Sequence, residues 1–267
     1  MGTKGSIFTF LCICLHIGTH SEKSNFCGIK NESSSSGEIL NYKVFYSLAG
    51  AYIGAGEATF SNNLETFQQK TVYHFTGFGK TYSTYDWIYK VRDTYESFVD
   101  TSSMLPLKFS RQVNETGNHI FNSVLFNQTT NHAVSTNGVF NIPPCIQDVL
   151  SAIYYARNLD FSKAKNGDIF PFSIYLDDHV YPVYIRYMGK ANLKTKYGNF
   201  NTIKFKPKLI EGTLFKGGEQ MTVYVTDDAN KIPVFVETPI LVGSIKVFLS
   251  EFKNNRNKTT GIISMKR

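Results

Sequence analysis

The chain has 267 residues, of which 42% are hydrophobic and 15% aromatic, so it can bury a sizeable core and is not a disordered chain. Its formal net charge is +7, but the segment from Lys253 to Arg267 holds five of the basic residues and no acidic one, and the body before it is nearly neutral. Because a DNA-binding domain carries its positive charge on a folded face, this distribution argues against a nucleic-acid partner.

An apolar run from Ser6 to Gly18 follows Lys4 and precedes small polar residues. Its length of about 13 residues suits the hydrophobic region of a secretory signal and falls short of the roughly 20 residues that span a bilayer. We therefore expect a signal peptide over residues 1–21 and an exported protein, periplasmic or associated with the outer membrane. A buried N-terminal helix or strand is the alternative. No later segment approaches spanning length, so no transmembrane segment is expected in the mature chain.

Composition also divides the mature chain. Residues 22–36 include a serine run and predict a polar linker, residues 37–252 predict a single β-rich domain, and residues 253–267 predict a basic flexible tail. Removal of the signal leaves two cysteines, Cys27 and Cys145. In an oxidising compartment this pair predicts one disulfide, with two unrelated buried thiols as the alternative. Two cysteines without a suitably spaced histidine do not complete a four-ligand metal site, so no metal or other cofactor is expected.

From Gly37 the chain alternates with a period of two. Leu40, Tyr42 and Val44 face one way, which is typical of a half-buried strand in an antiparallel sheet. Further short runs rich in aromatic and β-branched residues follow at hairpin spacing, among them Tyr85–Phe98 and Ile169–Leu176. They predict an antiparallel barrel or curved sheet.

One segment departs from this pattern. Apolar residues and one arginine recur at helical spacing after Pro143-Pro144: Ile146, Val149, Leu150, Ile153, Tyr154 and Arg157. Pro144 fits the first position of such a helix. A single helix among many strands should bury its apolar stripe against the sheet. The predicted fold class is therefore mainly all-β, a strongly curved antiparallel sheet or barrel-like fold with one amphipathic helix packed against it.

Four motifs occur in a fairly specific order: Gly37–Val44 (GEILNYKV), Gly54–Thr59 (GAGEAT), Leu150–Arg157 (LSAIYYAR) and Pro239–Lys246 (PILVGSIK). Together they resemble a family of exported bacterial proteins known as domain of unknown function 3108, over roughly residues 37–252. The resemblance implies an exported, β-rich envelope protein. It brings no established activity and no catalytic residues.

Six lysines without an intervening acid mark a hairpin expected near residues 190–208: Lys190, Lys194, Lys196, Lys204, Lys206 and Lys208. A three-residue loop at Gly198–Phe200 would set Lys194 opposite Lys204, and directly opposed like charges destabilise a sheet. An anionic partner, such as a phosphate-bearing lipid headgroup, would offset that repulsion. The alternative is a solvated edge that lysines protect from aggregation.

The aromatic residues offer a second candidate site. Trp87 shares an expected strand face with Tyr85 and Tyr89, and Tyr154 lies on the helical stripe. Core packing is the ordinary interpretation, and the competing one is a groove between sheet and helix that holds an acyl chain. The candidate ligand-binding residues are thus Lys194, Lys204, Lys206, Lys208, Trp87 and Tyr154.

Catalytic and nucleotide-binding motifs are weak. Residues 77–81 (GFGKT) end like a phosphate-binding loop, but His74 stands where that motif requires glycine, so no nucleotide is expected. The pairs Asp177-Asp178 and Asp227-Asp228 lie between expected strands, where turn chemistry explains them better than a glycosidase acid pair does.

These observations favour a non-enzymatic envelope protein that binds an apolar or lipidic ligand or a protein partner. A hydrolase acting on envelope glycan or lipid and a purely structural module are the alternatives. A continuous apolar tunnel would indicate a carrier, and a filled interior would indicate a scaffold. A polar cleft with two carboxylates, or with a histidine against a serine, would indicate an enzyme.

Overall fold

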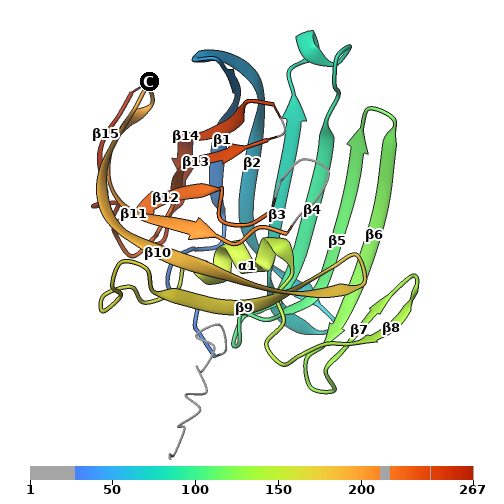
Figure 1. The fold of residues 1–267 in the computed structure, drawn as a ribbon. Coiled ribbons are helices and arrows are strands. Elements are labelled where there is room, and N and C mark those ends of the chain that lie inside the picture. Colours follow the sequence, from blue (N-terminus) through green and yellow to red (C-terminus); the bar gives the residue numbers. More distant parts are fainter. Residues whose placement is uncertain (1–27, 211–216, 241, 267) are drawn as a thin grey trace, which may run out of the picture.

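The computed structural model describes residues 28–210, 217–240 and 242–266 of the chain. These residues form one antiparallel sheet of fifteen strands, which is strongly curved and open and wraps around α1 (Figure 1). The predicted fold class, a curved β-sheet with one helix packed against it, is confirmed.

The elements follow in chain order. The first group is β1 (Glu38–Leu48), β2 (Ala51–Phe67), β3 (Lys70–Thr81), the short 3-10 helix η1 (Ser83–Tyr85), β4 (Arg92–Asp100), β5 (Pro106–Glu115), β6 (Asn118–Asn127), β7 (His132–Ser135) and β8 (Gly138–Asn141). The second group is α1 (Val149–Ala156), β9 (Ile169–Leu176), β10 (His179–Thr195), β11 (Gly198–Pro207), β12 (Thr222–Thr226), β13 (Pro233–Pro239), β14 (Ser244–Lys253) and β15 (Ile262–Met265).

Two meanders build the sheet. Each strand from β1 to β8 pairs with the next, and so does each strand from β9 to β14. β14 pairs with β1, with Val44 opposite Val247, and this pairing joins the meanders. β8 and β9 therefore end the path of strands, and the two ends approach each other. Asp177 in the β9–β10 turn forms an ion pair with Arg111 of β5, and Asn137 in the β7–β8 turn donates a hydrogen bond to Asp178.

α1 begins where Asp148 caps it. The Asp148 carboxylate accepts hydrogen bonds from the backbone N–H groups of Leu150 (2.8 Å) and Ser151 (2.7 Å), and the Ser151 hydroxyl accepts one from the Asp148 N–H. This capping box satisfies donors that have no partner inside the helix. The sequence predicted that the helix starts at Pro144, but it does not, because Cys145 has a φ of 63°, outside the right-handed helical region.

Aromatic side chains fill the concave side of the sheet. Tyr154 of α1 stacks on Phe75 of β3 with ring centroids 3.7 Å apart, and the two residues are 1% and 0% exposed. The same cluster includes Phe109, Phe126, Phe161, Phe170, Tyr175, Tyr187 and Phe205. The space between sheet and helix, where a groove had been considered, is therefore occupied by the protein's own core.

The expected strand Tyr85–Phe98 is shorter in the structure. β4 begins at Arg92, and the preceding residues form η1 and an exposed connection. The Arg92 guanidinium lies 2.7 Å from the Asp86 carboxylate, which also accepts a hydrogen bond from the Thr81 hydroxyl. These contacts close the connection and keep its residues out of the sheet. Trp87 lies at its tip and is 83% exposed.

The lysine hairpin adopts a different register from the predicted one. β10 and β11 pair Thr195 with Gly198, so Lys194 lies opposite Asn199 and not opposite Lys204. The Thr195 hydroxyl accepts a hydrogen bond from the Gly198 N–H at 3.1 Å and thereby selects a two-residue turn. A bulge between Tyr187 and Lys190 then shifts the pairing further along the hairpin. The expected repulsion between directly opposed lysines does not arise.

The segments expected to be a linker and a flexible tail both contribute to the folded domain. Ser34 is fully buried, and the Asn62 amide donates a hydrogen bond to its hydroxyl at 3.1 Å. The C-terminal segment forms β15, which pairs with β11 and places Ser264 opposite Asn199. Their polar composition suggested a linker and a flexible tail. The prediction did not hold because composition does not show the hydrogen-bond partners that the tertiary structure supplies.

The predicted signal peptide and Cys27 lie outside the described residues, so the Cys27–Cys145 disulfide stays a prediction. Within the described part of the chain, no helix has both the length and the apolar character needed to cross a membrane.

Candidate functional site

The two acidic pairs form turns. Asp177 and Asp178 adopt φ values of 51° and 60°, a left-handed conformation that Asp tolerates. Asp227 follows β12 and forms an ion pair with Lys190 at 2.7 Å, and Asp228 accepts hydrogen bonds from nearby backbone N–H groups. Both pairs therefore stabilise turns, as the sequence predicted.

His74 belongs to a cluster that sequence reasoning missed. Its Nδ1 lies 2.8 Å from the Glu65 carboxylate and its Nε2 lies 3.1 Å from Glu96, and its ring stacks on Phe98 with centroids 4.3 Å apart. Neighbouring positions on β2, β3 and β4 bring these side chains together. Because carboxylates engage both ring nitrogens, neither is available to activate a nucleophile. Among the described residues, no group of three His, Cys, Asp or Glu side chains is placed to hold a metal ion.

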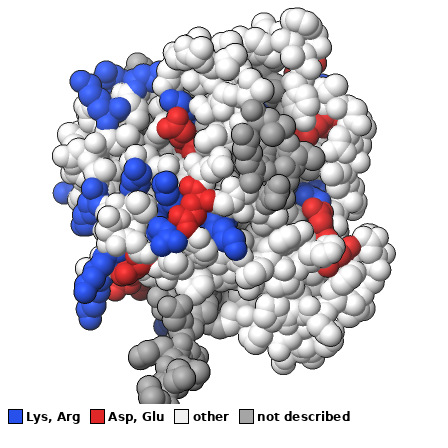
Figure 2. Space-filling view, in the orientation of Figure 1, with Lys and Arg blue, Asp and Glu red and all other residues white. Residues whose placement is uncertain are grey.

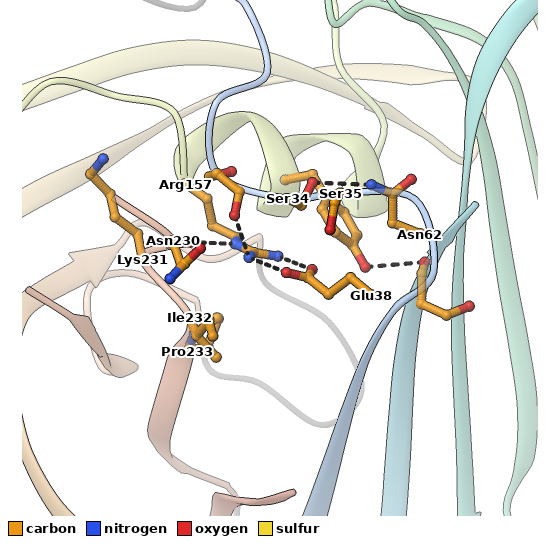
Figure 3. Close-up of polar contacts among 12 residues, drawn as sticks. Ser34, Ser35, Glu38, Asn62, Arg157, Asn230, Lys231, Ile232 and Pro233 are labelled. Carbon is orange, nitrogen blue, oxygen red and sulfur yellow. Dashed lines mark hydrogen bonds and ion pairs between the residues drawn. The ribbon is translucent and has the colours of Figure 1, made fainter. Parts of the chain in front are cut away.

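A buried ion pair joins the end of α1 to the start of β1. Arg157 and Glu38 make two contacts, Nη1–Oε1 at 2.6 Å and Nη2–Oε2 at 2.8 Å, and their side chains are 2% and 0% exposed (Figure 3). Arg157 also donates to the carbonyl oxygens of Ser33 and Asn230 at 3.1 and 3.0 Å. The Arg157 guanidinium thus holds the N-terminal segment, the helix and the β12–β13 connection together.

Burial and charge shift the pKa values around this pair. Burial opposes the charge on Arg157, but the adjacent Glu38 carboxylate outweighs that effect and raises the pKa of Arg157. Burial raises the pKa of Tyr42 and of Tyr154, and it lowers the pKa of Lys231. The pair is enclosed by protein, so it has a structural role and does not face a ligand.

A shallow hollow with a volume of about 500 Å³ opens to solvent on the described part of the protein. It lies between the β3–β4 connection and the β5–β6 turn. Its acidic groups already have partners, since Asp86 pairs with Arg92 and Glu115 accepts a hydrogen bond from the Tyr89 hydroxyl at 2.6 Å. It is neither an apolar tunnel nor a cleft with two free carboxylates.

Six lysines lie on or directly after β10, β11 and β15, and we call this set the basic surface: Lys194, Lys196, Lys204, Lys206, Lys208 and Lys266. Lys194, Lys196 and Lys266 lie near the β10–β11 turn, where β15 pairs with β11, and the other three follow farther along β11. Figure 2 shows many Lys and Arg side chains, with some Asp and Glu between them, on the side of the molecule where Figure 1 places these strands. The Lys266 N–H donates to the Tyr197 carbonyl at 2.8 Å, which brings the end of the chain to the β10–β11 turn. The basic tail and the lysine hairpin therefore form one surface.

Most of the charge of the basic surface is uncompensated, although Arg186 and, to a lesser extent, Lys206 contribute to lowering the pKa of Glu219. Among the described residues, none of its lysines has a carboxylate oxygen within 4 Å, whereas the neighbouring Lys190 pairs with Asp227 and Arg186 pairs with Glu219. Residues 142–267 hold 18 Lys and Arg against 11 Asp and Glu, and residues 38–141 hold 7 against 8. The positive charge of the protein thus belongs to its C-terminal half.

Aromatic rings lie close to three of these lysines, and Lys208 Nζ is 5.8 Å from the ring centroid of Tyr184. Lys196 Nζ lies 3.3 Å from the ring centroid of Phe45 on β1, and Lys204 Nζ lies 5.6 Å from that of Tyr224 on β12. Desolvation by its surroundings lowers the pKa of Lys196. Such cation–π contacts orient an ammonium group and leave its charge unneutralised.

The six predicted ligand-binding residues occupy three different places. Lys194, Lys204, Lys206 and Lys208 share the basic surface, whereas Tyr154 is a core residue whose hydroxyl donates to the Ser61 carbonyl at 3.1 Å. Trp87 stands alone at the tip of the β3–β4 connection. Sequence reasoning left out Lys266, because only the pairing of β15 with β11 brings it to this surface.

Comparison with known proteins places the chain among β-rich proteins of unknown function. The model of the family "Protein of unknown function (DUF3108)" matches residues 41–250. No curated protein matches the chain. Among solved structures, it is similar to a β-barrel-like protein of the domain of unknown function DUF1849 from Brucella abortus, with a TM-score of 0.53 and 8% identity, covering 81% of this chain and 97% of that one. A putative exported protein with a YmcC-like fold from Bacteroides fragilis gives a TM-score of 0.32 and 11% identity, covering 85% and 99%.

Proposed function

The chain belongs to the DUF3108 family of proteins of unknown function, and on that premise we propose that it is an exported, non-enzymatic envelope protein whose basic surface binds anionic groups. The proposed ligands are phosphate-bearing lipid headgroups on an envelope membrane. The proposal places the protein in the periplasm or against the outer membrane, which agrees with the N-terminal apolar run.

The observation that carries the proposal is the uncompensated charge of the basic surface. Six lysines on or directly after β10, β11 and β15 have no carboxylate partner within ion-pair distance among the described residues, although acidic side chains neutralise Lys190 and Arg186 on the same hairpin. Each basic residue close to an anionic membrane surface contributes about 1 kcal/mol to binding. A set of this size is therefore sufficient for reversible attachment.

Because core side chains fill the interior, we place the binding site on the surface. Tyr154, Phe75 and their neighbours occupy the concave side, so an apolar ligand would have to displace well-packed core residues. The proposal likewise includes no catalytic step, since the acidic pairs form turns and both nitrogens of His74 are engaged.

The test is cosedimentation of the full chain with vesicles of phosphatidylglycerol mixed into phosphatidylcholine, with pure phosphatidylcholine vesicles beside them. We expect binding to the anionic vesicles alone, weakening as the salt concentration rises. The double variant Lys194→Glu, Lys204→Glu should lose at least tenfold in apparent affinity. Equal binding by this variant and the original protein would refute the proposal.

A matched control separates location from net charge. Lys70 and Lys90 are exposed lysines of the N-terminal half, and reversing both changes the net charge by the same amount. Lys70→Glu, Lys90→Glu should keep most of the binding. If this control loses as much vesicle binding as Lys194→Glu, Lys204→Glu, then binding depends on the net charge of the protein and not on the basic surface.

A further inference from the structure

The strands at one end of the sheet form an uncharged surface. No Asp, Glu, Lys or Arg occurs between Glu115 and Asp148, a stretch that contains all of β6, β7 and β8. Figure 2 shows the corresponding lobe, at the lower right, as a white surface with acidic side chains only along its upper border. A soluble domain normally mixes charges over its whole surface, so such a gap is unusual.

Apolar side chains are exposed on this same surface. Leu125 of β6 pairs with Val134 of β7, which pairs with Val139 of β8, so the three form one cross-strand row. They are 41%, 43% and 65% exposed, and Phe121 on β6 is 72% exposed. A contiguous row of exposed apolar residues marks an interaction surface, whereas single ones do not.

β8 also presents an open edge. It pairs with β7 on one side, and the described residues place no strand on its other side. β9, at the opposite end of the strand path, is covered, because the Gln147 N–H donates to the Ser173 carbonyl and the Gln147 carbonyl accepts from the Tyr175 N–H. Within its four residues β8 has no lysine, proline or bulge, so its shortness is what limits pairing at this edge.

We infer that this edge, with its apolar row, binds a second copy of the chain. Two β8 strands pair antiparallel about a twofold axis and continue the sheet, and the rows Leu125–Val134–Val139 of both copies meet across the axis. The inference is independent of the proposed function, since it uses a different part of the surface.

Charge supports a second copy as the occupant. A charged surface meets its own sign across a twofold axis, whereas β8 itself carries no charge. At the start of β8, Asn137 donates to the Asp178 carboxylate, and the adjacent Asp177 is neutralised by Arg111. The nearest cation on the row, Lys108 of β5, lies three strands away from β8. At about 4.8 Å per strand the two copies of Lys108 are roughly 34 Å apart, well beyond the screening length of about 10 Å in 0.1 M salt. The pairing also leaves both basic surfaces free.

The test is the molar mass of the full chain by light scattering from 5 to 200 µM protein at neutral pH. The mass should rise with concentration from that of one chain to that of two. Val139→Lys should weaken dimerisation at least tenfold, because two ammonium groups would meet at the axis, and it should leave thermal unfolding of the monomer unchanged, since Val139 faces solvent. Val134→Lys should act in the same direction.

Two controls make the result specific. Val242 is 62% exposed in the β13–β14 turn, so Val242→Lys introduces the same change at equal exposure and should keep the dimer. Lys194→Glu, Lys204→Glu should also keep it, whether or not that variant binds vesicles. A constant mass of one chain for the original protein, or a dimer that survives Val139→Lys, would overturn the inference.

Discussion

Arg157 and Glu38 face each other as a two-point ion pair, at 2.6 and 2.8 Å, in a site from which water is almost excluded. The pair connects the residue after α1 with the first residue of β1. The helix and the start of the sheet are thereby fixed together, and the core closes between them.

Removing one partner of the pair should be costly. Arg157→Met leaves the Glu38 carboxylate buried without compensation, which we expect to lower the free energy of unfolding by about 3–5 kcal/mol. Urea unfolding measures this loss. The double variant Arg157→Met, Glu38→Leu should recover much of it, because replacing both charges removes the uncompensated one. The matched variant Arg92→Met breaks the more exposed pair with Asp86 and should cost no more than about 1 kcal/mol. Equal losses for the two arginines would contradict this account.

The cap of α1 should make stability depend on pH. Burial raises the pKa of Asp148 from 3.8 to about 6. Because the folded-state pKa exceeds the unfolded one, the folded protein binds the proton more tightly. This contribution to stability is present at low pH and is lost as the pH rises from about 4 through about 6. The stability of the original protein relative to Asp148→Asn should therefore increase as the pH falls from 7.5 to 5, as thermal melts of both proteins would show. A difference that stays constant over this range would rule out such a titration.

Truncation of Tyr154 should destabilise the protein strongly, and truncation of Trp87 should hardly affect its stability. Tyr154→Ala empties a stacked position in the core, and we expect it to cost about 3–5 kcal/mol of unfolding free energy. Trp87→Ala removes a side chain that is 83% exposed and should change that energy by less than about 0.5 kcal/mol. Chemical denaturation of the two variants provides the measurement. A large loss on truncating Trp87 would show that its side chain packs against the protein in solution.

The predicted Cys27–Cys145 disulfide should be visible in the exported protein. Under non-reducing conditions the intact mass should be lower by two hydrogen atoms than the reduced mass, and a peptide containing both cysteines should appear after digestion. Closing so long a loop stabilises by up to ~4.7 kcal/mol, so a reductant should lower the melting temperature. Two free thiols in protein recovered from the periplasm would contradict the prediction.

Local patterns in the sequence predicted the elements whose cause is local. The alternation of Leu40 and Tyr42 indicated β1, and the spacing of Leu150, Tyr154 and Arg157 indicated α1, because burial on one face imposes those periods. Ile153, which the same spacing placed on the buried stripe, is 41% exposed. The resemblance to DUF3108 was confirmed over residues 41–250. The division of the sheet into two meanders joined through β1 and β14 was not predicted, because no local signal encodes that pairing.

The candidate site was only partly predictable, for a similar reason. The lysines of β10 and β11 were visible in the sequence, but their register depends on the hydroxyl of Thr195 and on a bulge. Lys266 joined them through the pairing of β15 with β11, and His74 met Glu65 and Glu96 across three strands. Contacts between distant segments decide these arrangements, and a single sequence does not display them.

The most direct test of the proposed function is amide hydrogen exchange of the full chain with and without anionic vesicles. We expect slower exchange in residues 194–208 and 262–266 when phosphatidylglycerol is present, and unchanged exchange in the exposed connection 83–91. Protection at that connection without protection of β10, β11 and β15, or no protection anywhere on the protein, would contradict the account.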